Sequence, residues 1–150
     1  MIDNAESVAR ALFSPRMIYN GELQPEAFQL RQSIAEEYLS VVRMSIDTWK
    51  EDILMIPQRK NRQLYGYTEM SVEEIRNARF GEVEFDVKAC DNSTMKSHAG
   101  IFITVGGEKL KAGQHLSTSE DDVSQDFLLL AIQRKLVEIA RKGLHSISTD

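Results

Sequence analysis

Residues 82–110 read EVEFDVKACDNSTMKSHAGIFITVGGEKL, and this stretch contains the clearest strand pattern in the chain. Apolar and polar residues alternate over 82–89, which is typical of a strand with one face buried and one in water. Residues 99–105 are nearly all apolar, so they predict a more central strand of the same sheet. Gly106 and Gly107 then supply a two-residue hairpin turn. We therefore expect two paired strands whose connection leaves His98 at one end of the sheet.

Shorter patterns upstream predict a strand within residues 26–44 and five further elements. Each is bounded by a capping, turn or proline signal. Residues 26–44 fit either a helical or a strand period, and within them we favour a strand at 39–42. The five expected elements are a helix from Asp3 or Asn4 to about Phe13, a strand at 17–19 followed by a turn at Asn20-Gly21, a short helix carrying Trp49 and Ile53, a strand at 64–70, and a helix from a Ser71 capping box to Ala78.

The C-terminal part of the chain has the strongest helical pattern. Its apolar residues recur at helical spacing, acids precede them and bases follow, which suits the helix dipole. We expect Glu138 to pair with Lys142 one turn later. Residues 127–132, in the first half of this helix, are apolar on every side. This half of the helix is therefore expected to lie deep in the domain or to meet a second subunit. The positions at helical spacing are Leu129, Ile132, Leu136, Ile139 and Ala140.

Together these elements predict one α+β domain over residues 1–150, with a largely antiparallel sheet packed against a long C-terminal helix. No internal repeat, low-complexity tract or linker divides the chain. With one cysteine, Cys90, the chain forms neither an intrachain disulfide nor a cysteine-based zinc cluster, which suits a reducing, cytoplasmic setting. The longest apolar run, 127–132, is too short to predict a membrane span.

The net charge of −5 makes nucleic acid an unfavourable partner, because the field of the chain repels phosphate backbones at long range. One local exception is the basic run from Arg59 to Arg62, which precedes Tyr65 and Tyr67. Such a cluster can hold a phosphate and stack a base, although short basic runs are usually solvated loops. A nucleic-acid module built on residues 59–67 is therefore the third functional hypothesis.

Among the titratable side chains, His98 stands out because polar loop residues surround it at the expected sheet end. A histidine there can act as a general acid or base, or it can simply hydrogen-bond a loop carbonyl. Ser97 precedes it, but adjacent strand residues point to opposite faces, which argues against a nucleophile and base pair. We assign no catalytic residue. The scattered histidines predict no metal site, and no phosphate-loop motif or other cofactor signature is present.

Two arginines, Arg31 and Arg43, lie within the ambiguous segment 26–44. An arginine beside a buried strand can bind an anion, because its guanidinium matches a carboxylate or phosphate with two parallel hydrogen bonds. It can equally be a surface charge or the partner of an acid. Both arginines are therefore binding candidates, together with His98.

The middle of the chain contains three short segments, Ala27-Phe28, Leu39-Ser40-Val41 and His98-Ala99-Gly100-Ile101. Their order resembles a group of small uncharacterised bacterial proteins, over roughly residues 23–105. Where members of that group show Asn-Pro shortly before the histidine, this chain has Met95-Lys96-Ser97. The resemblance implies a bacterial intracellular domain. It also draws attention to Phe28, Ser40 and His98, and makes Ser40 a further binding candidate.

The leading functional prediction is a non-enzymatic interaction or accessory module of a bacterial intracellular system, such as defence or toxin–antitoxin. An acidic chain without a recognisable catalytic constellation, ending in an apolar-rich helix, suits docking to a protein partner or self-association through that helix. The alternative is a small enzyme acting on a nucleotide-like or phosphorylated metabolite, with His98 as acid or base and Arg31 or Arg43 holding the anion. Neither prediction includes a cofactor or a membrane partner.

Overall fold

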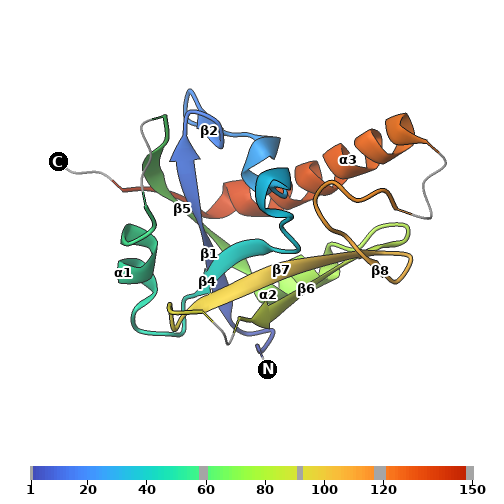
Figure 1. Ribbon diagram of the computed structural model, residues 1–150. Coiled ribbons are helices and arrows are strands. Elements are labelled where there is room, and N and C mark those ends of the chain that lie inside the picture. The colour runs from blue at the N-terminus through green and yellow to red at the C-terminus, as the bar shows by residue number, and fades with distance from the viewer. Residues whose placement is uncertain (1, 58–60, 91–92, 117–120, 148–150) are drawn as a thin grey trace.

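The computed structural model describes residues 2–57, 61–90, 93–116 and 121–147, and it confirms the α+β fold with a largely antiparallel sheet (Figure 1). The sheet has seven strands in the order β6-β7-β4-β1-β5-β9, with β8 paired to the C-terminal end of β7. A separate two-stranded ribbon consists of β2 and β3. The strands are β1 (Ser7–Ser14), β2 (Ile18–Tyr19), β3 (Glu22–Leu23), β4 (Leu39–Arg43), β5 (Gln63–Ser71), β6 (Val83–Ala89), β7 (His98–Val105), β8 (Glu108–Lys109) and β9 (Leu144–Ser146).

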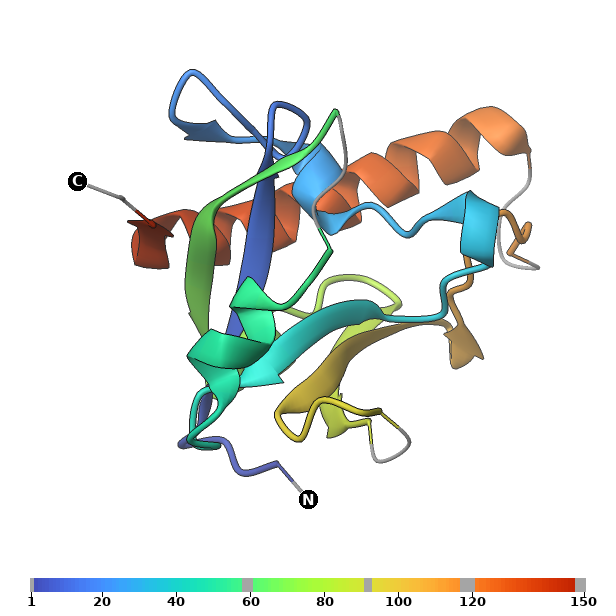
Figure 2. The ribbon, with the colours of Figure 1, turned by 60° about the vertical axis from the view of Figure 1, so that its left-hand side comes forward.

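Helices pack on the sheet from different sides. The long helix α3 packs against the 3₁₀ helix η1, strand β5 and helix α2, whereas α1 lies beside β4 (Figures 1 and 2). Ser71 caps α2 by accepting a hydrogen bond from the Glu74 amide at 3.3 Å, as the capping box predicts. The helices are η1 (Pro25–Phe28), η2 (Gln32–Ile34), α1 (Trp49–Leu54), α2 (Val72–Asn77), α3 (Asp122–Ala140) and η3 (Arg141–Gly143).

The predicted strand pair in residues 82–105 is confirmed as β6 and β7. Its register runs from Val83 opposite Val105 to Ala89 opposite Ala99. Gly106 and Gly107 both have left-handed backbone angles, with φ of 59° and 82°, which suit the two-residue turn into β8. His98 therefore opens β7 at the opposite end of the sheet from this turn.

The helix expected from Asp3 or Asn4 to Phe13 is wrong, because this segment contains strand β1. Val8 and Leu12 have the four-residue spacing of a helical face, and both are fully buried. They are buried in a central strand, however, with β5 paired along most of its length and β4 paired at its start. A strand covered on both faces shows no alternation in its sequence, so its local pattern cannot be distinguished from that of a short helix.

Strands β1 and β4 pair only briefly and then separate. The register contains two pairs, Val8 with Arg43 and Ala9 with Val42, whereas β1 and β5 stay paired from Ser7 to Ser14. Beyond these pairs, β1 continues beside β5 while β4 turns away beside β7 (Figures 1 and 2). The sheet is therefore open between β1 and β4, and a pocket lies at this opening.

Asp121 caps the N-terminus of α3, and its side chain accepts a hydrogen bond from the Ser124 amide at 2.7 Å. Ile132, Leu136 and Ala140 are buried on its inner face, as the spacing predicts. The expected burial of residues 127–132 on several sides is wrong for the single chain, since Phe127 is 69% exposed. The expected pair of Glu138 with Lys142 is also wrong.

The partner of Lys142 belongs to another helix. Its ammonium lies 2.8 Å from Glu74 of α2, so this ion pair connects the end of α3 to its neighbour rather than stabilising α3 internally. Among the described residues, we find no helix with the length and apolar character needed to span a membrane.

Candidate functional site

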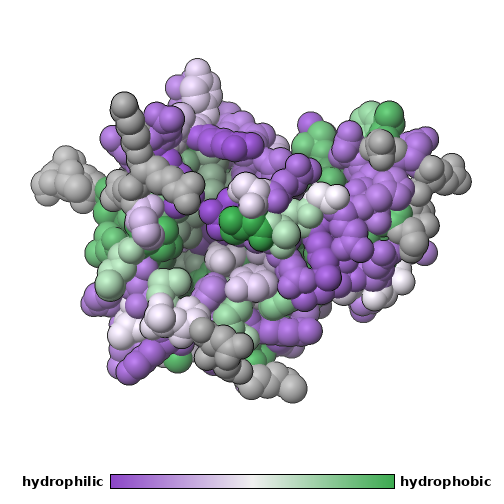
Figure 3. All heavy atoms as spheres, viewed as in Figure 1, coloured by the Kyte–Doolittle hydropathy of each residue, from purple (hydrophilic) through white to green (hydrophobic). Residues whose placement is uncertain are grey.

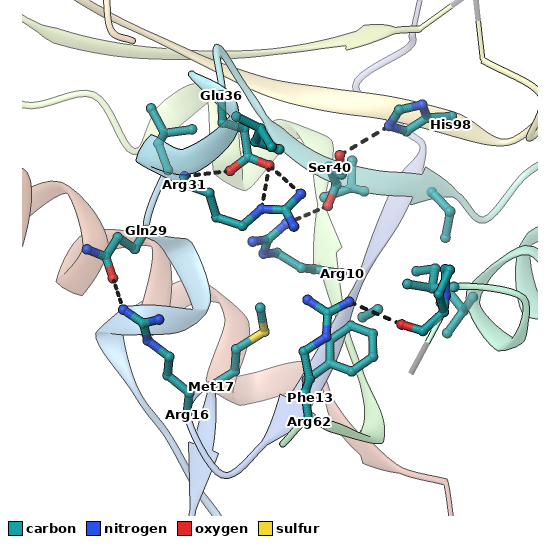
Figure 4. Close-up of a pocket in the computed structure, with 18 of the residues that line it drawn as sticks. Arg10, Phe13, Arg16, Met17, Gln29, Arg31, Glu36, Ser40, Arg62 and His98 are labelled. Atoms are coloured by element: carbon teal, nitrogen blue, oxygen red, sulfur yellow. Dashed lines mark hydrogen bonds and ion pairs between the residues drawn. The ribbon is translucent and has the colours of Figure 1, made fainter. Parts of the chain in front are cut away.

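The candidate site is a pocket with a volume of about 1360 Å³ that lies between the diverging strands β1 and β4 (Figure 4). Its floor includes Ala9 and Arg10 of β1 and Ser40 of β4. Residues of the η1–η2 segment form one wall, and the end of α1 contributes to another. Four arginines line it in a chain whose net charge is −5: Arg10, Arg16, Arg31 and Arg62.

Arg10 fills the opening where the two strands separate. It is only 7% exposed, and its guanidinium lies 5.7 Å from the centre of the Phe28 ring. Its Nε donates to the Ala27 carbonyl at 2.6 Å and one terminal nitrogen donates to the Ser40 carbonyl at 2.7 Å. Arg10 thus supplies hydrogen-bond donors to one carbonyl of η1 and one of β4, at the point where the pairing between β1 and β4 has ended. Within the part of the chain that the structure describes, no carboxylate lies at ion-pair distance from Arg10.

The electrostatic surroundings of Arg10 are unfavourable to its charge. The pKa of Arg10 is lowered to about 10, mainly by burial; the charge of Glu36 opposes this shift, and the nearby charges of Arg31 and Arg62 add to it. Arg10 is still protonated at neutral pH, because even the lowered value lies well above 7. A buried cation with two like charges nearby is a position at which an anion would be strongly stabilised.

The other pocket arginines have partners of different kinds. Arg31 pairs with Glu36 through two guanidinium nitrogens at 3.1 and 3.3 Å, and Glu36 also accepts from the Arg31 amide at 2.9 Å. Arg16 donates to Gln29 at 3.3 Å. The guanidinium of Arg62 lies 3.9 Å from the centre of the Phe13 ring, a cation–π contact. The acids that line the pocket are Glu26, Glu36 and Asp52.

Ser40 and His98, distant in sequence, meet at the pocket. Ser40 Oγ and His98 Nε2 are 3.2 Å apart. The register pairs Val42 with His98 and Ser40 with Gly100, which places Ser40 and His98 on one face of the sheet. Gly100 makes room there for Tyr38, since an added Cβ would lie 2.6 Å from that ring.

The His98 ring is half-buried between Tyr38 and the pocket. Burial lowers the pKa of His98, so the imidazole is neutral at pH 7. Its Nδ1 is buried and has no hydrogen-bond partner among the residues that the structure describes. No acid therefore orients the ring in the way that a serine, histidine and aspartate triad requires. The geometry supports His98 as a polar wall of the pocket and leaves its acid–base role a prediction.

One binding candidate, Arg43, and the neighbour of another, Ser97, lie outside this pocket. Arg43 lines no part of this pocket: its guanidinium donates to Glu6 at 3.0 and 3.1 Å, and these bonds lower the pKa of Glu6 to about 2. Ser97 is buried and donates to Asp52 at 2.5 Å, away from His98. This bond is the main cause that lowers the pKa of Asp52, and it connects α1 to the loop before β7.

The structure separates the basic and aromatic cluster predicted at 59–67. Arg59 and Lys60 lie outside the described residues. Arg62 faces the pocket, whereas Tyr65 packs against the main core and Tyr67 stacks on His145 with ring centres 4.9 Å apart. The described part of this segment therefore forms no single stacking surface.

Sequence reasoning identified Arg31, Ser40 and His98, which the structure brings to one pocket, and it missed Arg10. The available signal was a lone charged residue inside the apolar run from Val8 to Phe13. Among the described residues, no group of three ligating side chains is placed to hold a metal ion. No protein-family model, curated protein or solved structure matches the chain.

Proposed function

We propose that the chain binds a small phosphorylated metabolite in the pocket between β1 and β4. The observation that carries this proposal is Arg10, a guanidinium buried in the pocket wall with two carbonyls as its hydrogen-bond acceptors. Arg31 supplies a second guanidinium, and Ser40 and His98 supply polar groups beside them (Figure 4). Guanidinium groups bind phosphoryl oxygens through paired, charge-assisted hydrogen bonds, which are about twice as strong as neutral ones.

The distribution of charge supports a small ligand over a nucleic acid. The chain has a net charge of −5, so a long polyanion meets repulsion from most of the surface. The arginines instead line one pocket, and Arg31 and Arg62 are near enough to Arg10 to lower its pKa. Low local dielectric strengthens contacts between these arginines and a phosphoryl group relative to the same contacts on an open surface.

The two arginines singled out in the sequence provide a matched test. Both are ion-paired, Arg31 with Glu36 and Arg43 with Glu6, but only Arg31 lines the pocket. We expect Arg31→Gln to weaken the binding of inorganic phosphate about tenfold, because one charge-assisted hydrogen bond contributes about 1.5 kcal/mol. Arg43→Gln is expected to leave phosphate affinity unchanged. Titration calorimetry at constant ionic strength measures both.

The same experiment can contradict the proposal. If the wild-type chain binds neither phosphate nor sulfate, the pocket is not an anion site. If Arg31→Gln and Arg43→Gln weaken binding equally, the effect arises from overall charge rather than from the pocket. A melting temperature that rises with phosphate and not with chloride is an independent readout, since a ligand bound only to the folded state stabilises it.

A second candidate is the interaction module that the sequence favoured, in the form of self-association through α3 in a bacterial cytoplasmic protein. It is favoured by Val123 and Phe127, which are four residues apart on α3 and are 64% and 69% exposed. Exposed apolar side chains on one helical face commonly mark an interface. We expect the sedimentation coefficient of the wild-type chain to rise with concentration and that of Phe127→Ser to stay constant. A wild-type chain that remains monomeric at every concentration removes this candidate.

A further inference from the structure

The pocket is larger than a phosphoryl group needs, and part of its lining is apolar. Its volume of about 1360 Å³ exceeds the range of roughly 300–1,000 Å³ that is usual for small-molecule sites. Beyond the arginines, its walls include Leu30, Ile34 and Ile56. A phosphate bound at Arg10 and Arg31 would leave most of this space unfilled. The ligand that fits therefore has a second, largely apolar part.

Two of the apolar residues are unusually exposed. Ile34 of η2 is 59% exposed and Met55 at the end of α1 is 78% exposed, and both line the pocket. In the space-filling view, hydrophobic side chains lie over α1 and over the segment that crosses in front of α3, on either side of a hollow (Figure 3). Large apolar side chains at the mouth of a pocket are stabilised when a ligand covers them.

The apolar residues that line the pocket favour a ligand with a ring over a ligand with an alkyl chain. Three of the six methionines of the chain, Met17, Met55 and Met95, line this pocket. Methionine sulfur makes favourable contacts with aromatic rings, and its flexible side chain adapts to flat ligands of different outline. The pocket thus combines guanidinium groups for a phosphoryl group with soft apolar side chains for a planar ring.

We infer that the ligand is a phosphate monoester of a ring-bearing compound, of which a nucleoside monophosphate is the type. Its phosphoryl group lies at Arg10 and Arg31, and its ring lies against Ile34 and Met55. This inference rests on the proposed function, since it adds the ring to a phosphorylated ligand. The Ser40 and His98 pair, 3.2 Å apart at the same pocket, supplies hydrogen-bonding groups for the polar atoms of the ligand.

The experiment compares four probes by titration calorimetry: adenosine 5′-monophosphate, uridine 5′-monophosphate, ribose 5-phosphate and inorganic phosphate. We expect at least one nucleotide to bind about tenfold more tightly than ribose 5-phosphate, because burial of a ring adds to the phosphoryl contacts. Met55→Gln and Ile34→Gln are expected to reduce that ratio about threefold each, with little change in the affinity for inorganic phosphate.

Leu54 provides the matched control. It precedes Met55 and is 57% exposed, but it does not line the pocket, so Leu54→Gln is expected to leave every affinity unchanged. If both nucleotides and ribose 5-phosphate bind equally, the ring has no site and this inference is overturned while the anion pocket stands. If the nucleotide preference survives both Met55→Gln and Ile34→Gln, the ring lies elsewhere and the inference is also overturned. If no probe binds, the proposed function itself fails.

Discussion

Replacement of Arg10 by methionine is expected to weaken phosphate binding about a hundredfold. Arg10 is the most deeply buried cation of the pocket, and its like-charged neighbours Arg31 and Arg62 add to the attraction for an anion. Loss of a buried, charge-assisted contact costs about 3 kcal/mol, which is close to a factor of one hundred in affinity. Methionine has a similar length and no charge, so it fills the space without replacing the contact. Titration calorimetry with inorganic phosphate measures the change.

The stability of the Arg10→Met chain is set by two opposing effects. The Ala27 and Ser40 carbonyls lose their donors, at a cost of about 1–3 kcal/mol for each acceptor left buried and unpaired. The chain also no longer buries an uncompensated charge, which offsets part of that cost. We expect a net loss of about 2 kcal/mol in the free energy of unfolding. Urea is the suitable denaturant, because guanidinium ions would compete with the pocket arginines for phosphate.

Two further variants separate binding from folding. Arg10→Lys keeps the positive charge but has one ammonium nitrogen in place of the three nitrogens of the guanidinium group. This variant is therefore expected to fold and to bind phosphate about tenfold more weakly. Arg76→Met removes an ion pair with Asp86, 2.9 Å long and outside the pocket, and is expected to leave phosphate affinity unchanged. Full phosphate affinity in a folded Arg10→Met chain would make Arg10 a purely structural bridge between η1 and β4.

The parts of the fold that the sequence predicts correctly are those whose signals are local. They are the Gly106-Gly107 turn, the Ser71 cap and the periodic face of α3. The local pattern of β1 predicts a helix because a central strand is covered on both faces. Val8 and Leu12 pack in the main core with residues of α3, and Ala9 packs in a second cluster with Ile53 of α1, so the burial depends on segments distant in sequence. The incorrect helix prediction for this segment also conceals that Arg10, its one charged residue, lines the pocket.

The pocket shows the same division between local and long-range information. The sequence indicates His98 and Ser40 as binding candidates on separate grounds. The 3.2 Å contact between them follows only from the register of β4 with β7. Arg31 and Arg43 both follow an apolar residue in the segment 26–44, yet Arg31 lines the pocket and Arg43 pairs with Glu6. The partner of an arginine is decided by which segments fold against it, and a single sequence does not contain that information. The resemblance to the bacterial group stays a prediction.

Replacement of Leu136 by alanine is expected to cost about 2–5 kcal/mol of unfolding free energy, the range measured for fully buried leucines. Leu136 lies on the inner face of α3 with no exposed surface, and its truncation opens a cavity in the main core. Phe127→Ala on the same helix is the control. Because Phe127 is largely exposed, its truncation is expected to change stability by no more than about 0.5 kcal/mol.

Urea denaturation of the two variants at low protein concentration gives both values. A small cost for Leu136→Ala would mean that α3 contributes little to the core, and the sheet would then have to be stable without the helix. A large cost for Phe127→Ala would mean that this side chain is covered in solution, which a single chain does not explain. In that case the cost should grow with protein concentration, because association through α3 stabilises only the wild-type chain.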